Sequence, residues 1–360
     1  MSIKLYEQNA YLKEFDAHII SQTKKDDLYD IILDQTALFP EEGGQTCDKG
    51  FLNDIEVIDV QIIDDKIHHY LKQEIKNPVH GRIDWTHRYS NMQNHTGEHI
   101  LSGVIHHEYH LNNVGFHLGN TEITADYDGN LDNHQITYIE KTVNQIIQEN
   151  HLVKTYYLDD YSNVDYRAKL DLDKPRLVEI EGIDLCACCA PHVHNTNEVG
   201  LFKIIKSMKI KKGTRLFILC GKRAIDDYIL KHNEVNTISN QLSSKPYEIS
   251  KNVQRILDEN YKMSIEIKNL HKQLIDHKQI EFKSNHIVFE DGLDRDTQLH
   301  YFNRLLEKTK NTVLLISGNR FMTNNIEILS PFKYRGGGKN NFYQGTLETN
   351  IDEVKKQIEE

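Results

Sequence analysis

Two short segments of the chain place metal-binding side chains four residues apart. The first carries His95 and His99, and the second carries Cys188 and His192. Three imidazoles and one thiolate are a ligand set that suits tetrahedral zinc. We expect a helix to begin near Asn91, and on a helix residues four apart lie on the same face. Because the proline before His192 disfavours a helix, that pair is expected in a loop that enters a strand. The two pairs are predicted to bind one zinc ion per chain.

Chance pairs and neighbouring side chains leave the ligand set open at this stage. The chain has 20 His residues, so pairs four apart also arise at random, as ordinary hydrogen-bonded histidines. A Cys-x3-His pair strengthens the case, since complementary pairs are the usual zinc signature. Cys186 and Cys189 stand close to Cys188, and His194 is a further imidazole. The spacing to His192 favours Cys188 as the thiolate ligand.

The first segment also fits the inverted zinc-protease pattern H-x-x-E-H, in which Glu98 would serve as the general base. That pattern needs a carboxylate as third ligand further along the chain, and it has no use for Cys188 or His192. A zinc protease is therefore an alternative interpretation of the helix rather than of the whole chain.

Length and composition indicate a globular protein of several domains. The chain has 360 residues, of which 38% are hydrophobic and 27% charged, and this length suffices for two or three domains. No apolar run approaches the roughly 18 residues of a membrane span, and the first residues show no secretory apolar region. Five Cys, three of them clustered, favour a reducing compartment and metal binding. We expect a cytoplasmic location and no membrane partner.

Basic residues gather in one segment although the formal net charge is -11. From Leu201 to Arg223 the chain has eight basic and no acidic residues. Since charges are screened over about 8 Å at physiological salt, acidic surface elsewhere barely cancels this patch. The segment suits an RNA backbone, although Lys-rich hairpins are also common as solvated strand faces. Its basic residues are Lys203, Lys206, Lys209, Lys211, Lys212, Arg215, Lys222 and Arg223.

The pattern of predicted elements indicates an α+β fold with a β-rich beginning. Residues 1–86 contain short alternating or β-branched runs and predict an N-terminal β-barrel domain, with a sandwich as the alternative. Residues 87–235 mix helices with strands and are predicted to form the α+β domain that holds the zinc site. We expect strands at 28–33, 55–62, 67–71, 200–205 and 215–219, and helices at 91–108 and 132–150.

A long helix is predicted in residues 236–284. Apolar side chains recur there at alternating steps of four and three, with one polar Asn260 among them. Such a heptad seam predicts a coiled coil, which packs either in a homodimer, the arrangement we favour slightly, or against the chain itself. The seam consists of Ile249, Val253, Ile256, Asn260, Met263, Ile267, Leu270 and Leu274.

The last part, residues 285–360, predicts a small α/β domain with strands at 287–289 and 312–316. Its glycine-rich segment from Arg335 to Asn341 lacks the G-K-[ST] of a nucleotide P-loop. The backbone amides between Arg335 and Lys339 are expected either to cradle a phosphate or to form a structural turn. We expect this domain to bind tRNA through Arg335 and Lys339 or to take part in the homodimer.

Several segments together resemble the free-standing alanyl-tRNA editing proteins and the editing half of alanyl-tRNA synthetase. The resemblance runs over nearly the whole chain in the expected order, as in the long form of the editing proteins. It includes the glycine-rich segment, which is similar to the DHH-associated domain that ends the synthetase. The other segments are Phe39–Gln45, Met92–His99, Gly115–Gly119, Asp184–Cys188, His192–Val193 and Gly200–Ile204.

By this resemblance the family's zinc ligands fall on His95, His99, Cys188 and His192. One departure lies between the last two ligands. Where the family commonly has Gly-Gly-Thr, this chain has Cys189-Ala190-Pro191. The departure concerns the backbone of the loop and the missing Thr hydroxyl, while all four ligand types are present.

The activity that the resemblance implies is hydrolysis of the ester between a wrong amino acid and the 3′ end of tRNA(Ala). A pocket for alanine admits glycine and rejects serine only about 100-fold, so a second, hydrolytic site must remove them, with serine the favoured substrate. Gln45, Gln93 and Glu98 are the candidates for positioning the attacking water. Since four ligands leave zinc no open position, the ion is expected mainly to organise the pocket. A non-enzymatic RNA-binding protein with structural zinc is the alternative class.

Overall fold

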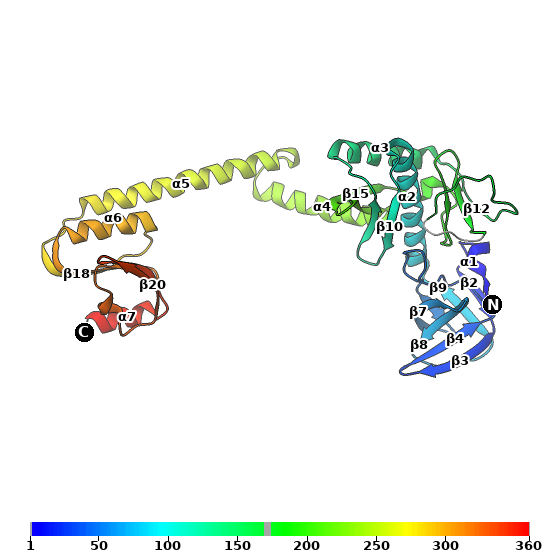
Figure 1. The fold of residues 1–360 in the computed structure, drawn as a ribbon, viewed down its shortest axis with the longest axis horizontal. Coiled ribbons are helices and arrows are strands. Elements are labelled where there is room, and N and C mark those ends of the chain that lie inside the picture. The colour runs from blue at the N-terminus through cyan, green and yellow to red at the C-terminus, as the bar shows by residue number, and fades with distance from the viewer. Residues whose placement is uncertain (1, 169–173, 360) are drawn as a thin grey trace. The chain divides into compact units, whose positions relative to one another are not determined.

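The computed structural model describes residues 2–168 and 174–359. The chain divides into two compact units, Met1–Glu234 and Val235–Glu360. The first unit carries an N-terminal sheet, a long central helix and two further sheets, and the second carries a long helix and a five-stranded sheet (Figure 1). This mixture of helices and sheets confirms the predicted α+β class. Within the described ranges, no helix is both long and apolar enough to cross a membrane.

Seven antiparallel strands form the N-terminal sheet in the order β2-β9-β6-β7-β8-β4-β3. Along β9 the side chains are alternately buried and exposed, with Val79 and Ile83 facing the core. Because successive side chains of a strand point to opposite faces, this pattern gives the sheet one buried face. The strands are β2 (Glu14–Ala17), β3 (Ile19–Lys25), β4 (Leu28–Leu33), β6 (Gly50–Leu52), β7 (Ile55–Ile63), β8 (Lys66–Leu71) and β9 (Val79–Ile83).

This sheet is open, so the predicted closed β-barrel is wrong. Its two outermost strands, β2 and β3, follow each other across His18, yet no ladder joins them in the described part of the chain. A barrel closes only when its first and last strands pair. At the junction between β2 and β3 the backbone amides bond to side chains instead. The His18 amide donates to the Asp34 carboxylate, and the Ile19 amide donates to the side-chain oxygen of Asn77. Beside the sheet lie helix α1 (Leu5–Gln8) and a parallel pair of short strands, β1 (Ile3–Lys4) and β5 (Gln35–Thr36).

Helix α2 (Trp85–Tyr109) is the central element of the first unit. It begins before the predicted start near Asn91, because the Asp84 side chain caps it by accepting a hydrogen bond from the His87 amide. Its residues 91–105 are all buried, and it contacts the elements α3, β10, β14 and β16. Figure 1 shows α2 leading from the N-terminal sheet into the rest of the unit. Side chains of residues 91–105 are therefore held by packing on every side.

Two smaller sheets, β10-β11-β16-β15 and β12-β13-β14, complete the first unit with helix α3. The turn before β14 approaches α2 closely at Gly103, where a Cβ atom would lie 2.4 Å from the carbonyl oxygen of Ile183. Only glycine permits this approach. The elements are β10 (Asn113–Leu118), β11 (Ile123–Tyr127), α3 (Asn133–Glu149), β12 (Val153–Tyr156), β13 (Leu177–Ile180), β14 (Asp184–Ala187), the 3-10 helix η1 (Thr196–Val199), β15 (Phe202–Ile210) and β16 (Gly213–Cys220).

The second unit is built around a sheet of order β17-β18-β19-β21-β20. Side chains of β18 alternate between two cores, with Val313 and Leu315 in one and Leu314 and Ile316 in the other. Helix α4 (Gly221–Gln241) spans the division between the units. The remaining elements are η2 (Pro246–Glu248), α5 (Ile249–His277), β17 (Lys283–Phe289), α6 (Arg295–Leu306), β18 (Thr309–Ser317), β19 (Arg320–Thr323), η3 (Ile326–Leu329), β20 (Tyr334–Lys339), β21 (Phe342–Leu347) and α7 (Ile351–Glu359).

The glycine-rich segment is an edge strand rather than a loop. Strand β20 pairs with β21 along its whole length. The connecting residues Asn340 and Asn341 both have positive φ, 55° and 59°, as a two-residue hairpin turn requires. Arg335 forms an ion pair with Glu348. The alternative of a structural turn therefore describes this segment better than a phosphate cradle.

The heptad seam of α5 is largely exposed. Val253, Ile267 and Leu274 have exposed fractions of 40%, 54% and 60%. The residue of α5 that is buried is Ile275, which lies outside the seam and packs in the core of the second unit. Among the described residues, the seam is therefore not packed against the chain itself, which was the alternative to a homodimer.

Candidate metal centre

Four side chains from two distant segments meet beside α2. His95 and His99 project from the helix, while Cys188 and His192 belong to the loop that follows β14. The Cys188 Sγ atom lies 3.5 Å from His95 Nε2 and 3.4 Å from His192 Nε2. All four ligand atoms lie within 4.8 Å of one another. The structure thus brings together the four predicted ligands, and their chemistry suits a metal ion.

Each histidine of the cluster is held at its other ring nitrogen. His95 Nδ1 lies 2.8 Å from the side-chain oxygen of Gln45, and His192 Nδ1 lies 3.0 Å from the hydroxyl of Thr96. His99 Nδ1 lies 2.9 Å from an oxygen of Asp184. Such partners orient imidazoles in metal sites and fix the tautomer. The Nε2 atoms of all three rings remain for the ion.

Asp184 is in turn held by Arg167. The guanidinium donates two hydrogen bonds, of 2.6 Å and 2.9 Å, to the two carboxylate oxygens. Burial alone would raise the pKa of Asp184, but the hydrogen bonds from His99 and Arg167 hold it below its usual value. Asp184 therefore stays ionised behind His99. It also forms, with His99 and Cys186, a second group of possible metal ligands that overlaps the first.

Two members of the cluster, Cys188 and His192, are held in the form that binds a metal. Burial opposes ionisation of Cys188, but the charge of His95 and hydrogen bonds with His192 and His95 hold the pKa of the thiol well below its usual value. Burial also lowers the pKa of His192 to about 3, so this imidazole is neutral near pH 7. A thiolate and a neutral imidazole are the forms that bind zinc. Burial would lower the pKa of His99, but hydrogen bonds with Asp184 and Cys188 hold it well above its usual value, so this ring must give up a proton to an ion.

The loop between Cys188 and His192 is firmly packed despite its unusual sequence. Arg176 donates to the carbonyl oxygens of Cys188, at 3.1 Å, and Ala190, at 2.9 Å. Ala190 is fully buried in the core of the N-terminal sheet. Cys189 lies near Gly43. Residues 189–191 thus join the loop between Cys188 and His192 to the N-terminal part of the unit.

The segment Phe39–Gln45 reaches the cluster because it is fixed at both ends. Arg88 forms a fully buried ion pair with Asp48, which also accepts a hydrogen bond of 2.7 Å from the Phe39 amide. A Cβ atom on Gly44 would lie 2.2 Å from the carbonyl oxygen of Phe116, so glycine is needed where this loop meets β10. Gln45 is thereby placed behind His95.

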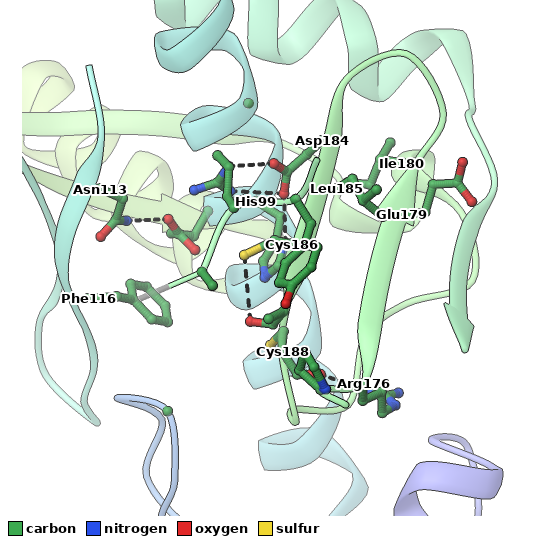
Figure 2. A pocket seen from close by; sticks show the side chains of 18 of the residues that line it. His99, Asn113, Phe116, Arg176, Glu179, Ile180, Asp184, Leu185, Cys186 and Cys188 are labelled. Atoms are coloured by element: carbon green, nitrogen blue, oxygen red, sulfur yellow. Dashed lines mark hydrogen bonds and ion pairs between the residues drawn. The ribbon is translucent and has the colours of Figure 1, made fainter. Parts of the chain in front are cut away.

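A cavity of about 1290 Å³ opens beside the cluster. His95, His99 and Cys188 line it, and Phe116, from β10, forms part of its wall. Figure 2 shows His99, Asp184 and Cys186 facing Asn113 and Phe116 across this space. The cavity is large enough for a nucleotide that carries an amino acid, because ligand pockets typically measure about 300–1,000 Å³.

The three candidate water-positioning residues lie in different places. Gln45 is fully buried and contacts His95 rather than the cavity. Gln93 donates to the backbone carbonyl of Glu198 at 2.8 Å and packs on Gly221, so the structure does not bring it to the cavity. Glu98 lines the cavity.

The predicted basic residues fall into two groups. Lys203 and Arg215 are engaged in ion pairs, of 2.6 Å each, with Glu140 and Asp126. Lys206 lies over the ring of Phe217. Four further basic residues are in no ion pair with a described residue: Lys209, Lys211 and Lys212 of the β15–β16 hairpin, and Lys339 at the end of β20.

Sequence reasoning missed the residues that support the cluster. Asp184, Arg167, Arg176 and Thr96 were not singled out, although Asp184 stands near the cysteines in the chain. A signal was present only for Asp184, because metal-bound histidines usually donate to a carboxylate or carbonyl.

Comparisons with known proteins point to translation. The family model described as the threonyl and alanyl tRNA synthetase second additional domain matches residues 176–217. This stretch begins at Arg176, includes Cys188 and His192, and ends in β16. The matched segment therefore contains half of the cluster and the whole β15 strand.

Similar proteins extend the match to nearly the whole chain. The alanyl-tRNA editing protein AlaX-L of Pyrococcus horikoshii is 27% identical over 98% of this chain and 96% of its own length. The alanine–tRNA ligases of Ignicoccus hospitalis and Sulfurisphaera tokodaii are 31% and 28% identical over 76% and 99% of this chain. The chain spans only 32% and 43% of those two ligases. These findings confirm the resemblance to the free-standing editing proteins.

Proposed function

We propose that this chain, similar over nearly its whole length to a free-standing alanyl-tRNA editing protein, hydrolyses wrongly charged tRNA(Ala). The bond cleaved is the ester between the amino acid and the 3′-terminal ribose. One observation carries the proposal: three histidines and a cysteine converge, and two of these histidines and the cysteine line a cavity of nucleotide size. The match of the family model to the segment that supplies Cys188 and His192 supports it.

The donor set fits one zinc ion, which His95, His99, Cys188 and His192 would hold. Imidazole nitrogens and a thiolate select zinc over magnesium or calcium, which prefer oxygen ligands. When bound, zinc would mainly organise the pocket, because four protein ligands leave it no open position. The ring nitrogens held by Gln45, Asp184 and Thr96 keep the three histidines oriented for the ion.

The cavity beside the cluster is proposed to bind the aminoacyl end of the tRNA, where the ester is hydrolysed. Water adds to the ester carbonyl, the bond between that carbon and the ribose oxygen breaks, and a proton passes from the water to the ribose. The products are the free amino acid and tRNA with an intact terminal ribose. Phe116 and the loop at Gly44 are proposed to form walls that limit water around the ester.

Serine is the proposed amino acid, with glycine as the second. A site rejects alanine strongly only when it hydrogen-bonds a group that alanine lacks, and the serine hydroxyl is such a group. Exposed lysines of the β15–β16 hairpin, Lys209, Lys211 and Lys212, are proposed to contact the tRNA backbone. Lys206, Arg335 and Lys339 are proposed as further contacts.

The geometry favours hydrolysis of tRNA esters over proteolysis. An inverted-motif protease needs Glu98 as base and a downstream carboxylate as ligand. The downstream carboxylate beside the cluster, Asp184, is already bonded to His99 Nδ1 and to Arg167. The four-residue cluster is completed by Cys188 and His192, which such a protease does not use. Peptide cleavage that is abolished by replacing Glu98 and unchanged in Cys188→Ala would instead support the protease interpretation.

The test is turnover of tRNA(Ala) charged with serine, glycine or alanine, measured side by side with catalytic amounts of protein. We expect many turnovers on seryl-tRNA, fewer on glycyl-tRNA, and alanyl-tRNA spared by about 100-fold or more. Tight binding of all three without turnover would instead identify a non-enzymatic RNA-binding protein.

A further inference from the structure

Four aromatic side chains gather at the first turns of helix α2. Trp85 and Tyr89 stack on each other with ring centroids 5.4 Å apart, and Tyr11 lies against both, at 5.5 Å and 6.4 Å. His194 stacks on Tyr11, with the two centroids 4.0 Å apart. His194 is exposed and the other three side chains are partly exposed, so the group reaches the surface. These four residues are called the aromatic platform below.

The aromatic platform is held in place from behind. The hydroxyls of Tyr11 and Tyr89 donate to the same oxygen of Glu198, at 2.6 Å and 3.1 Å. The Tyr11 oxygen also accepts a hydrogen bond of 3.1 Å from the His194 amide. Tyr11, Trp85 and Tyr89 pack against the core around α2. A surface that is already ordered loses little conformational entropy when it binds a partner.

Two cations lie beside the platform. The Lys13 ammonium stands over the Trp85 ring, 4.8 Å from its centroid, and the Lys49 carbonyl oxygen accepts from the Asp84 amide at the start of α2. Both lysines are exposed, and neither is in an ion pair with a described residue. An exposed contact between a lysine and a ring is weaker than the stacking of a nucleic-acid base on that ring. A base therefore displaces Lys13, whose ammonium then contacts a phosphate.

The platform is close to the metal cluster along two segments of the chain. His194 follows the ligand His192 by two residues, so their Cα atoms are at most about 8 Å apart. Trp85 precedes His95 by ten residues on α2, which is about 15 Å along the helix axis. A few nucleotides span these distances. The 3′ end of a tRNA is single-stranded, so its bases have faces free for stacking.

We propose that the aromatic platform stacks an unpaired base of the tRNA, from the single-stranded 3′ end that precedes the aminoacyl nucleotide, with Lys13 on an adjoining phosphate. This inference rests on the proposed function and adds a base contact outside the cavity. Every base has a face that stacks on an aromatic ring, so the platform holds the strand without reading its sequence. The contact anchors the 3′ end so that the ester reaches the cluster.

Trp85 is the only Trp of the chain, so its fluorescence reports directly on the platform. The experiment titrates the zinc-loaded wild type with tRNA(Ala) and with tRNA(Ala) that lacks its unpaired 3′-terminal nucleotides. Anisotropy of the labelled RNA measures binding independently. We expect intact tRNA to quench Trp85 and to shield it from acrylamide in proportion to the complex formed. The truncated tRNA should do neither when it is bound.

Trp85→Leu keeps an apolar side chain on the core but removes the ring. It should weaken binding of intact tRNA by about 5- to 100-fold, the contribution of one stacked base, and raise KM for seryl-tRNA with little change in kcat. Trp85→Phe should retain most of the affinity. Tyr228→Leu is the matched control, because Tyr228 stacks on His232, with centroids 5.6 Å apart, on α4 and outside the platform. Bound zinc, measured in every variant, shows whether the cluster is intact.

The inference is overturned if intact tRNA binds while the fluorescence of Trp85 and its access to acrylamide stay unchanged, a result that needs no variant. Equal quenching by the truncated tRNA, or equal losses of affinity in Trp85→Leu and Tyr228→Leu, would overturn it as well. A wild type that binds no tRNA(Ala) would overturn both this inference and the proposed function. Quenching by tRNA without any ester hydrolysis would refute the proposed function alone.

Discussion

Asp184 is the residue whose replacement should weaken the cluster without removing a ligand. In Asp184→Asn, His99 loses the carboxylate that orients its ring, and Arg167 loses its charge partner. We expect zinc affinity to fall about 10- to 100-fold, the usual cost of removing such a partner. Competition with a chromogenic chelator measures the affinity directly.

Asp126→Asn is the matched control for this change. Asp126 accepts two hydrogen bonds from Arg215, of 2.6 Å and 2.7 Å, in an arrangement like that of Asp184 but away from the cluster. Its zinc affinity should equal that of the wild type. Equal losses in the two variants would mean that the effect is on folding rather than on His99.

For single residues, the sequence predicted the four members of the cluster but not the side chains that bond to its histidine rings. Helical spacing alone places His95 and His99 on one face. The same rule, at 100° per residue, puts Gln93 about 200° from His95, so its absence from the cavity was predictable too. Gln45, Asp184 and Thr96 could not be assigned as partners of individual rings, because those contacts depend on how separate segments pack.

The N-terminal sheet carries a buried histidine that should make its stability depend on pH. His69, on β8, is fully buried, with Nδ1 3.1 Å from the Ile31 carbonyl oxygen and Nε2 3.0 Å from the Thr36 hydroxyl. Burial lowers its pKa to about 4. Below pH 6.5 the unfolded chain therefore takes up a proton that the folded chain does not. The folded state loses stability as pH falls from 6.5 to 4, by about 3 kcal/mol for this group.

His69→Gln keeps a donor and an acceptor but does not titrate. Urea unfolding at pH 7, 5.5 and 4.5 should show a shallower loss of stability in this variant than in the wild type. Identical pH slopes in the two proteins would refute the assignment to His69.

The β15–β16 hairpin is the element proposed to contact the tRNA backbone. Lys211→Ala with Lys212→Ala should weaken tRNA binding and reduce the slope of log affinity against log salt by about 1 to 2, since each phosphate contact contributes about 0.7–0.9. Titration of labelled tRNA(Ala) at several salt concentrations measures this slope.

Lys222→Ala with Lys231→Ala removes the same charge from α4, where these lysines already pair with Asp226 and Asp227. The control should leave the slope nearly unchanged. If both double variants change the salt slope equally, the net charge of the protein rather than the hairpin governs tRNA binding.

Elements with a strong periodic pattern were predicted well. Predicted strand 28–33 coincides with β4, and the predicted helix 132–150 is α3 to within one residue at each end. Closure of the N-terminal sheet was not predictable, because it depends on whether β2 and β3 pair. Side chains of Asp34 and Asn77, remote in the chain, occupy that junction instead.

At the scale of the whole molecule, the exposed seam of α5 is proposed to join two copies of the chain. Ile267→Lys puts a charge in the seam and should convert a dimer into a monomer, because buried apolar seam residues hold coiled coils together. Ile265→Lys is the control, since Ile265 is 42% exposed on the same helix but outside the seam. Light scattering after gel filtration gives the mass. A wild-type protein that is monomeric at micromolar concentration would rule out this dimer.

The central claim is that the His95, His99, Cys188 and His192 cluster holds the metal on which ester hydrolysis depends. The most direct measurement is the rate of seryl-tRNA(Ala) hydrolysis as a function of zinc bound per chain. Cys188→Ala should retain little zinc, since a structural site contributes on the order of 10 kcal/mol when complete. Cys47→Ser, which keeps a donor to Asp59, should retain it.

We expect the rate to fall in proportion to zinc on chelation, to recover when zinc is restored to the wild type, and not to recover in Cys188→Ala. Hydrolysis at the full rate by zinc-free protein would contradict the account.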